Sequence, residues 1–400
     1  MSWRAEGRAL EYSGPMIGSK ERLMRSKRVA LGVLRELSAS LADLGTFLPL
    51  VLGVLLVVQM DPTGVLVGFG VFALASGALY RRPIPVQPMK AVAAMGIAGL
   101  LSAETMVATT LVMGLVLLAL SWSDGILRLR RWIPNSLMHG LKLSLALSLI
   151  WVTQGGVQWQ WVEVCALLGV LIALQWTPLK PLSALLVMSG GLLWLMPDSG
   201  VLALLSFDPR LPPLSLPDLS SMLNAITAAA LPQLVLTVTN ALILTAVIAQ
   251  EYFPADNPPI TEQRLARSSG WANLLLAPLG AMPMCHGAGG LVAHHALGGR
   301  TGWTIALFGI GCLTVGLGFG HSAVALLAIV PGSLVVMLLL YAAWQIVDPA
   351  TLMRLRPSCY AVIGVMVITS WAFGLLAAIA VGWVAEAIRT RQWGPMMPTN

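Results

Sequence analysis

Two polar motifs led by proline interrupt apolar stretches of the chain, one in each half. The first is Pro85–Lys90 (PVQPMK) and the second is Pro283–Gly290 (PMCHGAGG). Proline lacks an amide hydrogen and glycine tolerates irregular backbone, so each motif predicts a break followed by a new helix. At membrane depth, irregular backbone persists only where protein or a water-filled cavity covers it. A matching pair of broken segments is typical of a transporter's binding site, and we expect one here.

The composition predicts the setting of these motifs. Hydrophobic residues make up 57% of the chain and charged residues 10%, with a mean hydropathy of +0.81. A soluble protein carries about 25% charged residues, so the sequence indicates a polytopic membrane protein with one membrane domain. Its four cysteines lack CxxC spacing, which predicts neither a zinc site nor a disulfide framework. We therefore expect no metal and no cofactor, and no cleaved leader.

Apolar runs of about 17 to 25 residues, separated by turn signals, predict about fourteen membrane spans. They are expected at 31–59, 64–80, from the Gln87 motif to 101, 105–122, 132–153, 159–176, 182–196, 220–250, 271–282, from the Cys285 motif to 297, 303–319, 323–346, 360–373 and 375–388. The predicted fold is all-α, with two sets of seven spans. Because seven is odd, the second set is inverted in the membrane relative to the first. The expected units are a basic cytoplasmic segment 1–28, a first repeat 29–200, an extracytoplasmic loop 201–218, a second repeat 219–390 and a cytoplasmic tail 391–400.

The distribution of Lys and Arg supports this count, because cytoplasmic loops collect these residues. With both termini in the cytoplasm, the opposite face receives only Arg210. The cytoplasmic face receives Arg81, Arg82, Arg128, Arg130, Arg131, Lys180, Arg264, Arg267, Arg300, Arg354, Arg356, Arg389 and Arg391. The net charge of +7 thus follows from topology, and no basic stripe with interleaved aromatics indicates nucleic acid.

The inverted arrangement predicts the chemistry of the shared site. The third span runs outward and the tenth inward, and both helices begin after their breaks, so their N-termini should meet near the midplane. Such ends carry partial positive charge and free N–H groups, which favour an anion. Gly287, Gly289 and Gly290 allow backbone to approach a ligand, and Lys90 adds a full charge. A small oxyanion is the expected ligand.

Five segments together resemble the molybdate transporter family, which is related to the sulfate permeases. They are 41–49 (LADLGTFLP), 85–90 (PVQPMK), 232–240 (PQLVLTVTN), 280–290 and 298–302 (GGRTG). The resemblance extends from about residue 30 to 390. It implies a seven-plus-seven inverted-repeat fold, in which a core domain carries the ligand against a gate domain, and it implies molybdate uptake. The chain ends shortly after its last predicted span without a regulatory domain, which favours the molybdate branch.

The expected substrate-binding residues come from the breaks and from the first and eighth spans. Gln87 can donate two N–H bonds to an oxyanion. Thr46, Thr239 and Asn240 are neutral donors at corresponding places of the two repeats, although each could instead satisfy a backbone carbonyl. The full expected set is Gln87, Met89, Lys90, Thr46, Thr239, Asn240, Cys285, His286, Gly287, Ala288 and Gly289.

Asp43 lies inside the first span, where a carboxylate is costly unless it is paired, protonated or hydrated. It is either a proton-coupling or gating residue beside the substrate or a fixed ion-pair partner of Lys90, which is expected three residues into its helix. His286, at a helix N-terminus, is expected to act as a neutral donor to the ligand. The roles of His139 and Lys142 in the fifth span stay open.

The leading hypothesis is a secondary transporter that imports molybdate by moving the core against the gate. The chain has no GxxxxGK[ST] motif, so ATP hydrolysis within it is not expected. A sulfate or other oxyanion transporter on the same fold is the main alternative. An intramembrane enzyme built on the Cys285 thiol is disfavoured because no orienting carboxylate lies near it, and a metal site with His286, His294 and His295 is disfavoured by spacing.

The remaining expectations concern the surroundings of the protein. Its partners are molybdate, with tungstate or sulfate as related ligands, and the lipid bilayer. The apolar outer faces of the gate spans could carry a homodimer. The compact loops fit a multi-pass protein of a bacterial inner membrane.

Overall fold

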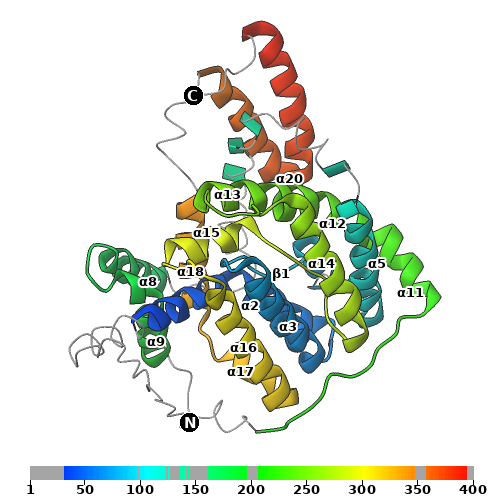
Figure 1. Cartoon of the computed structure of the whole chain (residues 1–400), viewed down its shortest axis with the longest axis vertical. Coiled ribbons are helices and arrows are strands. Elements are labelled where there is room, and N and C mark those ends of the chain that lie inside the picture. Colours follow the sequence, from blue (N-terminus) through cyan, green and yellow to red (C-terminus); the bar gives the residue numbers. More distant parts are fainter. Residues whose placement is uncertain are drawn as a thin grey trace, which may run out of the picture.

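The computed structural model describes residues 31–97, 99–122, 125–126, 136–137, 139–140, 143–144, 161–195, 206–346 and 357–393 (Figure 1). In the first half, the elements are helical residues 31–40, the 3-10 turn η1 (Leu41–Asp43), α2 (Leu44–Val57), α3 (Pro62–Tyr80), β1 (Gln87–Pro88), α4 (Lys90–Ile97), α5 (Ala103–Trp122), α8 (Trp161–Leu174), the 3-10 turn η2 (Lys180–Leu182) and α9 (Ser183–Trp194).

The second half begins with a long helical run. It comprises α11 (Leu219–Asn224), the π-helical η3 (Ala225–Ala230), α12 (Leu231–Leu236), the π-helical η4 (Thr237–Leu244) and α13 (Thr245–Tyr252). The remaining elements are α14 (Glu262–Leu276), η5 (Ala277–Leu279), β2 (Met284–Cys285), α15 (Ala288–Ala296), α16 (Gly302–Phe319), η6 (Gly320–Ser322), α17 (Ala323–Ala328), α18 (Gly332–Ile346) and α20 (Pro357–Trp393).

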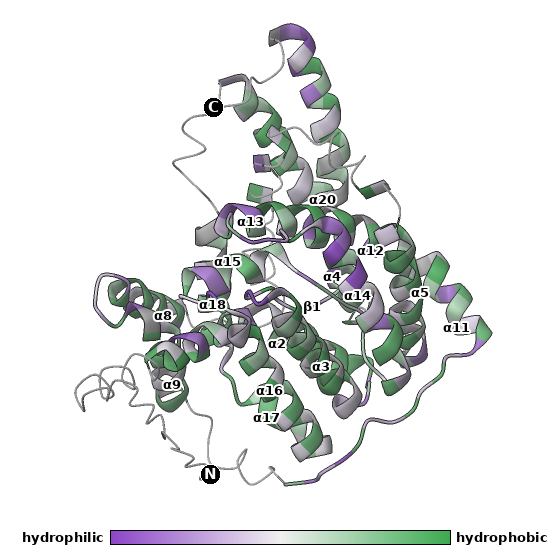
Figure 2. Ribbon diagram, in the orientation of Figure 1, coloured by the Kyte–Doolittle hydropathy of each residue, from purple (hydrophilic) through white to green (hydrophobic). Residues whose placement is uncertain are grey.

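Several helical stretches have the length and composition of membrane spans. Among the described residues, four are long and apolar enough to cross a bilayer: Leu31–Val57, Pro62–Tyr80, Ala103–Trp122 and Gly302–Ala328. Large apolar side chains such as Trp122 and Trp303 are exposed on the outside of the molecule. Figure 2 shows hydrophobic residues along most of the length of α3, α5 and α16. This combination of a buried core and an apolar exterior is the one that a lipid environment requires.

The helices that follow the two breaks are too short to span a membrane. α4 has 8 residues and α15 has 9. At 1.5 Å per residue they are about 12 to 14 Å long, against a hydrocarbon thickness of about 30 Å. Each is therefore a half-helix, as the broken motifs predict.

The helix at the ninth predicted span, α14, begins earlier than the sequence predicts. A short span was expected at 271–282, but α14 starts at Glu262, where the Thr261 side chain accepts a hydrogen bond from the Arg264 amide at 3.4 Å. The expectation was wrong because the first turns of α14 are polar, and hydropathy alone assigns such turns to a loop. Arg264 and Arg267 accordingly lie within the helix.

The final helical stretch, α20, folds back on itself. Arg389 Nη1 lies 3.5 Å from Ser358 Oγ, and Gly382 lies against the Met366 side chain. In a straight helix those pairs would be about 46 and 24 Å apart. Figure 1 shows the two limbs, in keeping with the two separate spans predicted at 360–373 and 375–388.

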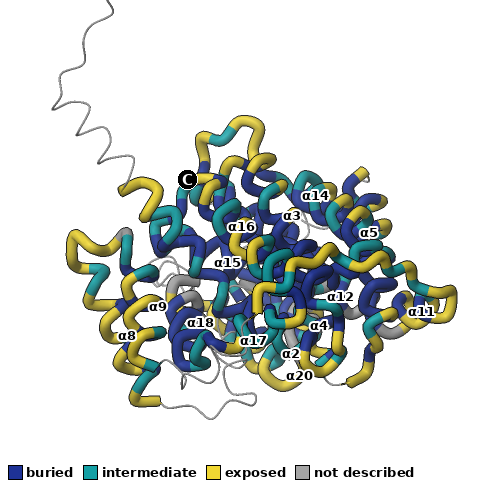
Figure 3. The backbone as a smooth tube through the Cα atoms, turned by 90° about the horizontal axis from the view of Figure 1, so that it is seen from below, coloured by how far each residue is buried: buried dark blue, intermediate teal, exposed yellow. Residues whose placement is uncertain are grey.

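Two helix pairs hold the central part of the molecule together. α3 packs along α16, and α5 packs along α14. The first pair approaches backbone to backbone, since a Cβ added to Gly302 would lie 2.1 Å from the Gly77 carbonyl oxygen. Small residues permit such approach in membrane helices, where dispersion contacts replace the hydrophobic effect. Figure 3 shows the buried centre at α3 and α15, and the exposed periphery at α8 and α11.

Candidate functional site

The two breaks meet in a short antiparallel strand pair. Gln87 is the partner of Cys285 in β1 and β2, and Pro88 is the partner of Met284. The Met89 amide extends this contact by donating to the Pro283 carbonyl oxygen at 2.9 Å. α4 starts directly after β1 and α15 starts three residues after β2, so the two half-helices begin at one place. Lys90 is the first residue of α4, which corrects the prediction of a position three residues into the helix.

The irregular backbone of the second break is satisfied by a side chain from α14. Asn273 is fully buried, and its Nδ2 donates to the Met284 carbonyl oxygen at 2.6 Å. Its Oδ1 accepts from the Met284 amide at 2.9 Å. A single amide thus replaces both ladder partners that a longer sheet would supply, and this is how the fold keeps non-helical backbone at this depth.

Asp43, Thr46 and Gln87 form one buried polar cluster. Gln87 Nε2 donates to Asp43 Oδ1 at 2.5 Å and to Thr46 Oγ1 at 3.0 Å. The Thr46 hydroxyl donates to the same carboxylate oxygen at 2.5 Å. Asp43 Oδ2 has no hydrogen-bond partner among the described residues. Both Gln87 N–H groups are therefore committed to protein oxygens, and they hold the break against η1 and α2.

Asp43 and Lys90 are not joined by an ion pair in the described part of the chain. The fixed ion pair considered from the sequence is thus replaced by the Gln87 and Thr46 hydrogen bonds to Asp43.

Two glycines let α15 approach this cluster. A Cβ added to Gly287 would lie 1.9 Å from Gln87 Oε1, and one added to Gly290 would lie 2.5 Å from Gln87 Nε2 and 2.9 Å from Asp43 Oδ1. Real Cβ atoms do not approach heavy atoms so closely, so a side chain at either position would force Gln87, Asp43 or the backbone of α15 to move. The glycines are required by contact with Gln87 and Asp43, in addition to the ligand approach inferred from the sequence.

The N-terminus of α4 is capped by Gln233, a residue that sequence reasoning did not select. Gln233 Oε1 accepts from the Ala91 amide at 2.9 Å and from the Val92 amide at 3.3 Å. Its Nε2 donates to Thr237 Oγ1 at 2.9 Å. The available signal was a glutamine after a proline in an apolar span, which parallels Gln87 after Pro85-Val86.

The N-terminus of α15 is open by contrast. Its N-cap, Gly287, has no side chain that could accept a hydrogen bond, and the Ala288, Gly289 and Gly290 amides have no acceptor among the described residues. All three residues are buried. Unpaired buried amides are rare, and at a helix N-terminus they form a site for an anion.

A family model described as "Molybdate transporter of MFS superfamily" matches residues 35–149 and 225–346, which include both breaks, Asp43 and Gln233. The chain belongs to the molybdate transporter family. It is similar to Molybdate transporter 2 of Arabidopsis thaliana, with 28% identity over 81% of this chain and 80% of that protein. Molybdate transporter 1 of the same plant is 26% identical over 90% of this chain and 88% of that protein.

The fold of this family member is shared with solved anion transporters. The transmembrane domain of a cyanobacterium bicarbonate transporter, BicA, aligns with a TM-score of 0.55 and 14% identity, covering 88% of this chain and 96% of that one. Murine Slc26a9, an anion transporter in the inward-facing state, aligns with a TM-score of 0.52 and 12% identity, covering 90% and 68%. At these identities the likeness establishes the fold, which is that of a polytopic membrane protein.

In this molybdate transporter family member, His286 is held by protein groups on both sides. Its Nδ1 lies 2.8 Å from the Pro85 carbonyl oxygen and its Nε2 lies 2.8 Å from Ser268 Oγ, which in turn bonds Tyr80 at 2.7 Å. With Nδ1 donating to the carbonyl, Nε2 accepts from Ser268. His286 therefore has no N–H left for a ligand, and it positions the two breaks relative to α14.

The other candidate residues occupy the same region with different partners. Met89 is fully buried, Thr239 Oγ1 lies 3.5 Å from the Leu236 carbonyl oxygen, and the Asn240 Oδ1 atom has no hydrogen-bond partner among the described residues. Cys285 is buried in β2. π-Helical turns often lie at functional sites, and η4 contains Thr239 and Asn240.

The two histidines in the last turn of α15, His294 and His295, have different partners. His294 Nδ1 lies 2.8 Å from the Ala39 carbonyl oxygen, whereas the His295 ring stacks on Tyr252 with centroids 3.9 Å apart. The described residues contain no group of three or more His, Cys, Asp or Glu side chains placed to hold a metal. His139 is helical, and Lys142 lies outside the described residues.

Proposed function

We propose that this protein is a secondary active transporter that imports molybdate, with the dianion held between the N-termini of α4 and α15. The observation that carries the proposal is the open end of α15, where the buried Ala288, Gly289 and Gly290 amides have no acceptor among the described residues. Lys90 adds a full positive charge at the start of the facing half-helix. Membership of the molybdate transporter family supports molybdate as the oxyanion.

In this proposal the two halves of the site have different tasks. Gln233 already supplies an acceptor to α4, so α15 provides the backbone donors and α4 provides the Lys90 charge. Gln87, Thr46 and His286 position the breaks. Cys285, in β2, and Asn240, in η4, which packs against α15, are proposed to line the site. In this proposal, fewer of the residues expected from the sequence contact the substrate, and the others hold the two breaks in place.

The proposed mechanism rests on a seven-plus-seven inverted repeat, with repeats at 29–200 and 219–390. In such a repeat, α3 corresponds to α14, and α5 corresponds to α16. The packing of α3 on α16 then has its counterpart in the packing of α14 on α5, and the structure contains both pairs. The inverted repeat is also supported by the half-helices α4 and α15, because the strands that precede them, β1 and β2, pair with each other. In this scheme the core carrying α4 and α15 moves against a gate that includes α8, α9, α18 and α20.

Asp43 is the proposed coupling group. Its carboxylate is buried, and one oxygen has no hydrogen-bond partner among the described residues. The other oxygen accepts a hydrogen bond from Gln87 at the first break. Protonation of Asp43 would change the bonds that hold Gln87, and this gives a proton gradient a route to the site. With both termini in the cytoplasm, the protein would lie in a bacterial inner membrane as a homodimer.

The test is calorimetric binding of molybdate to purified protein, with tungstate and sulfate as competitors. Displacement by tungstate but not by a large excess of sulfate supports the assignment. Equal affinity for sulfate would favour the second candidate, a general oxyanion transporter on the same fold, since size and oxygen spacing alone separate these dianions. Folded protein that binds none of the three would refute the anion site.

A further inference from the structure

A second polar cavity lies away from the two breaks, at the other end of α15. It has a volume of about 480 Å³ and is lined by side chains from four separate elements. Arg35 comes from helical residues 31–40, Lys180 from η2, His295 and Arg300 from the end of α15 and the following loop, and Tyr341 from α18. The size is within the range of small-molecule sites, about 300 to 1,000 Å³.

The cavity lining is strongly cationic. It contains Arg35, Lys180 and Arg300, and no carboxylate is among the lining residues. None of the three cations forms an ion pair in the described ranges. Glu36, the acid next to Arg35 in the chain, accepts hydrogen bonds from the Thr304 hydroxyl and, at 3.4 Å, from the Arg300 amide. Three positive charges and one committed carboxylate leave an excess that a dianion would balance.

The two arginines are held in place by backbone carbonyls. Arg35 Nε donates to the Gly298 carbonyl oxygen at 2.5 Å, and Arg300 Nη1 donates to the carbonyl oxygens of His295 at 2.5 Å and Gly299 at 2.7 Å. These neutral acceptors fix the guanidinium groups without neutralising them, and each group keeps further N–H donors. Partial burial and the neighbouring charge of Arg35 lower the pKa of Arg300, as expected for like charges pressed together.

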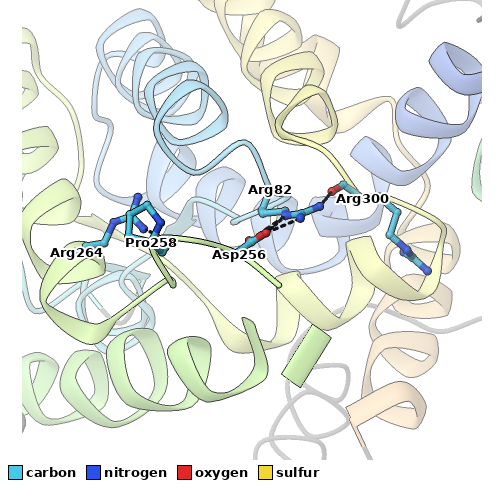
Figure 4. A network of polar contacts seen from close by, with 5 residues as sticks. All are labelled: Arg82, Asp256, Pro258, Arg264 and Arg300. Carbon is cyan, nitrogen blue, oxygen red and sulfur yellow. Dashed lines mark hydrogen bonds and ion pairs between the residues drawn. The ribbon is translucent and has the colours of Figure 1, made fainter. Parts of the chain in front are cut away.

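A separate network anchors the Arg300 backbone and leaves its side chain to the cavity. Arg82 forms an ion pair with Asp256, and its Nη1 donates to the Arg300 carbonyl oxygen at 3.2 Å. Figure 4 shows the Arg300 side chain pointing away from that pair and from Arg264. The guanidinium is thus presented by a rigid loop, which is a requirement for selective anion binding.

We propose that this cavity is a second oxyanion site, which binds a tetrahedral phosphate-type dianion through Arg35, Lys180 and Arg300. Bidentate hydrogen bonding by the guanidinium groups suits planar pairs of phosphate oxygens, and Lys180 contributes a point charge from the facing wall. The volume leaves room for an organic substituent, so the phosphate can be free or part of a lipid headgroup. The cavity is distinct from the proposed molybdate site, because it is built from other residues at the opposite end of α15.

The test is equilibrium binding of radiolabelled inorganic phosphate to the full chain in maltoside micelles, which contain no phosphate. Lys180→Gln and Arg300→Gln are each expected to weaken binding at least about tenfold, the loss of one charge-assisted contact. Lys180 is exposed, so its substitution should leave the fold intact. Arg267→Gln is the matched control, since Arg267 is an exposed cation outside the cavity.

Two further arms identify the source and the place of the anion. Short-chain phosphatidic acid that displaces phosphate at tenfold lower concentration would assign the site to a lipid headgroup, and weaker displacement would assign it to free phosphate. Ala288→Pro, which alters the proposed molybdate site, should leave phosphate affinity unchanged. Absence of phosphate and phosphatidic acid binding, or binding lost in Ala288→Pro but retained in Lys180→Gln, would overturn the proposal.

Discussion

Replacement of Ala288 by proline removes one N–H donor from the open end of α15 and little else. Ala288 is the first residue of the helix, a position where proline is well tolerated because its amide makes no intrahelical bond. The preceding residue, Gly287, has φ −150° and ψ 127°, an extended conformation that proline accepts in its neighbour. The substitution therefore tests the backbone donor without a change of charge.

The expected loss follows from the strength of a single hydrogen bond to a charged group. Such a bond contributes about 1.5 to 3 kcal/mol, which corresponds to an increase of about 10- to 100-fold in the dissociation constant for molybdate. Calorimetry on purified protein measures this change, and thermal unfolding without ligand monitors the fold. Molybdate should raise the unfolding temperature of the wild type far more than that of Ala288→Pro.

A matched proline elsewhere separates the donor from general effects of the substitution. Leu219 is the first residue of α11, follows the extended Asp218 and is 77% exposed, so Leu219→Pro makes the same chemical change outside the site. This variant should bind molybdate like the wild type. Unchanged affinity in a folded Ala288→Pro protein would refute the inference that the α15 amides hold the substrate.

Three further perturbations test the supporting cluster. Gly290→Ala should abolish molybdate binding because its Cβ would meet Gln87 and Asp43, whereas Gly311→Ala, with no atom within 4 Å, should be neutral in the same assay. Gln233→Ala should lower the free energy of unfolding by about 1 to 3 kcal/mol, measured by thermal denaturation, because it uncaps buried amides of α4; an unchanged stability would contradict the cap. Asp43→Asn keeps an oxygen for Gln87, so the variant should fold yet take up molybdate independently of the proton gradient; uptake that still follows the gradient would exclude Asp43 as the coupling group.

Local chemistry explains which expectations the sequence could support. Proline and glycine act on their own backbone, so the breaks at 85–90 and 283–290 and the half-helices after them were predictable. The same holds for the long apolar stretches. The early start of α14 was missed because its first turns are polar, and burial of Glu262 against other elements is a tertiary event.

Side-chain partners lay beyond the reach of the sequence. Gln87 was expected to face the ligand, yet its amide donates to Asp43, 44 residues away, and to Thr46 once the first span packs against the break. His286 meets Pro85 across 201 residues, and Gln233 meets Ala91 across 142. Which donor remains open is decided by these long-range contacts.

Residue composition and short motifs are enough to predict a membrane protein with two backbone breaks that could present helix N-termini to an anion. Hydropathy and the conformations open to proline and glycine are properties of single residues and short segments, and they are the same in any fold. That Gln233 caps the N-terminus of α4 while the N-terminus of α15 stays open follows from the packing of distant segments. Hydrogen bonds depend on distances of about 3 Å between residues far apart in the chain, and those distances exist only after packing.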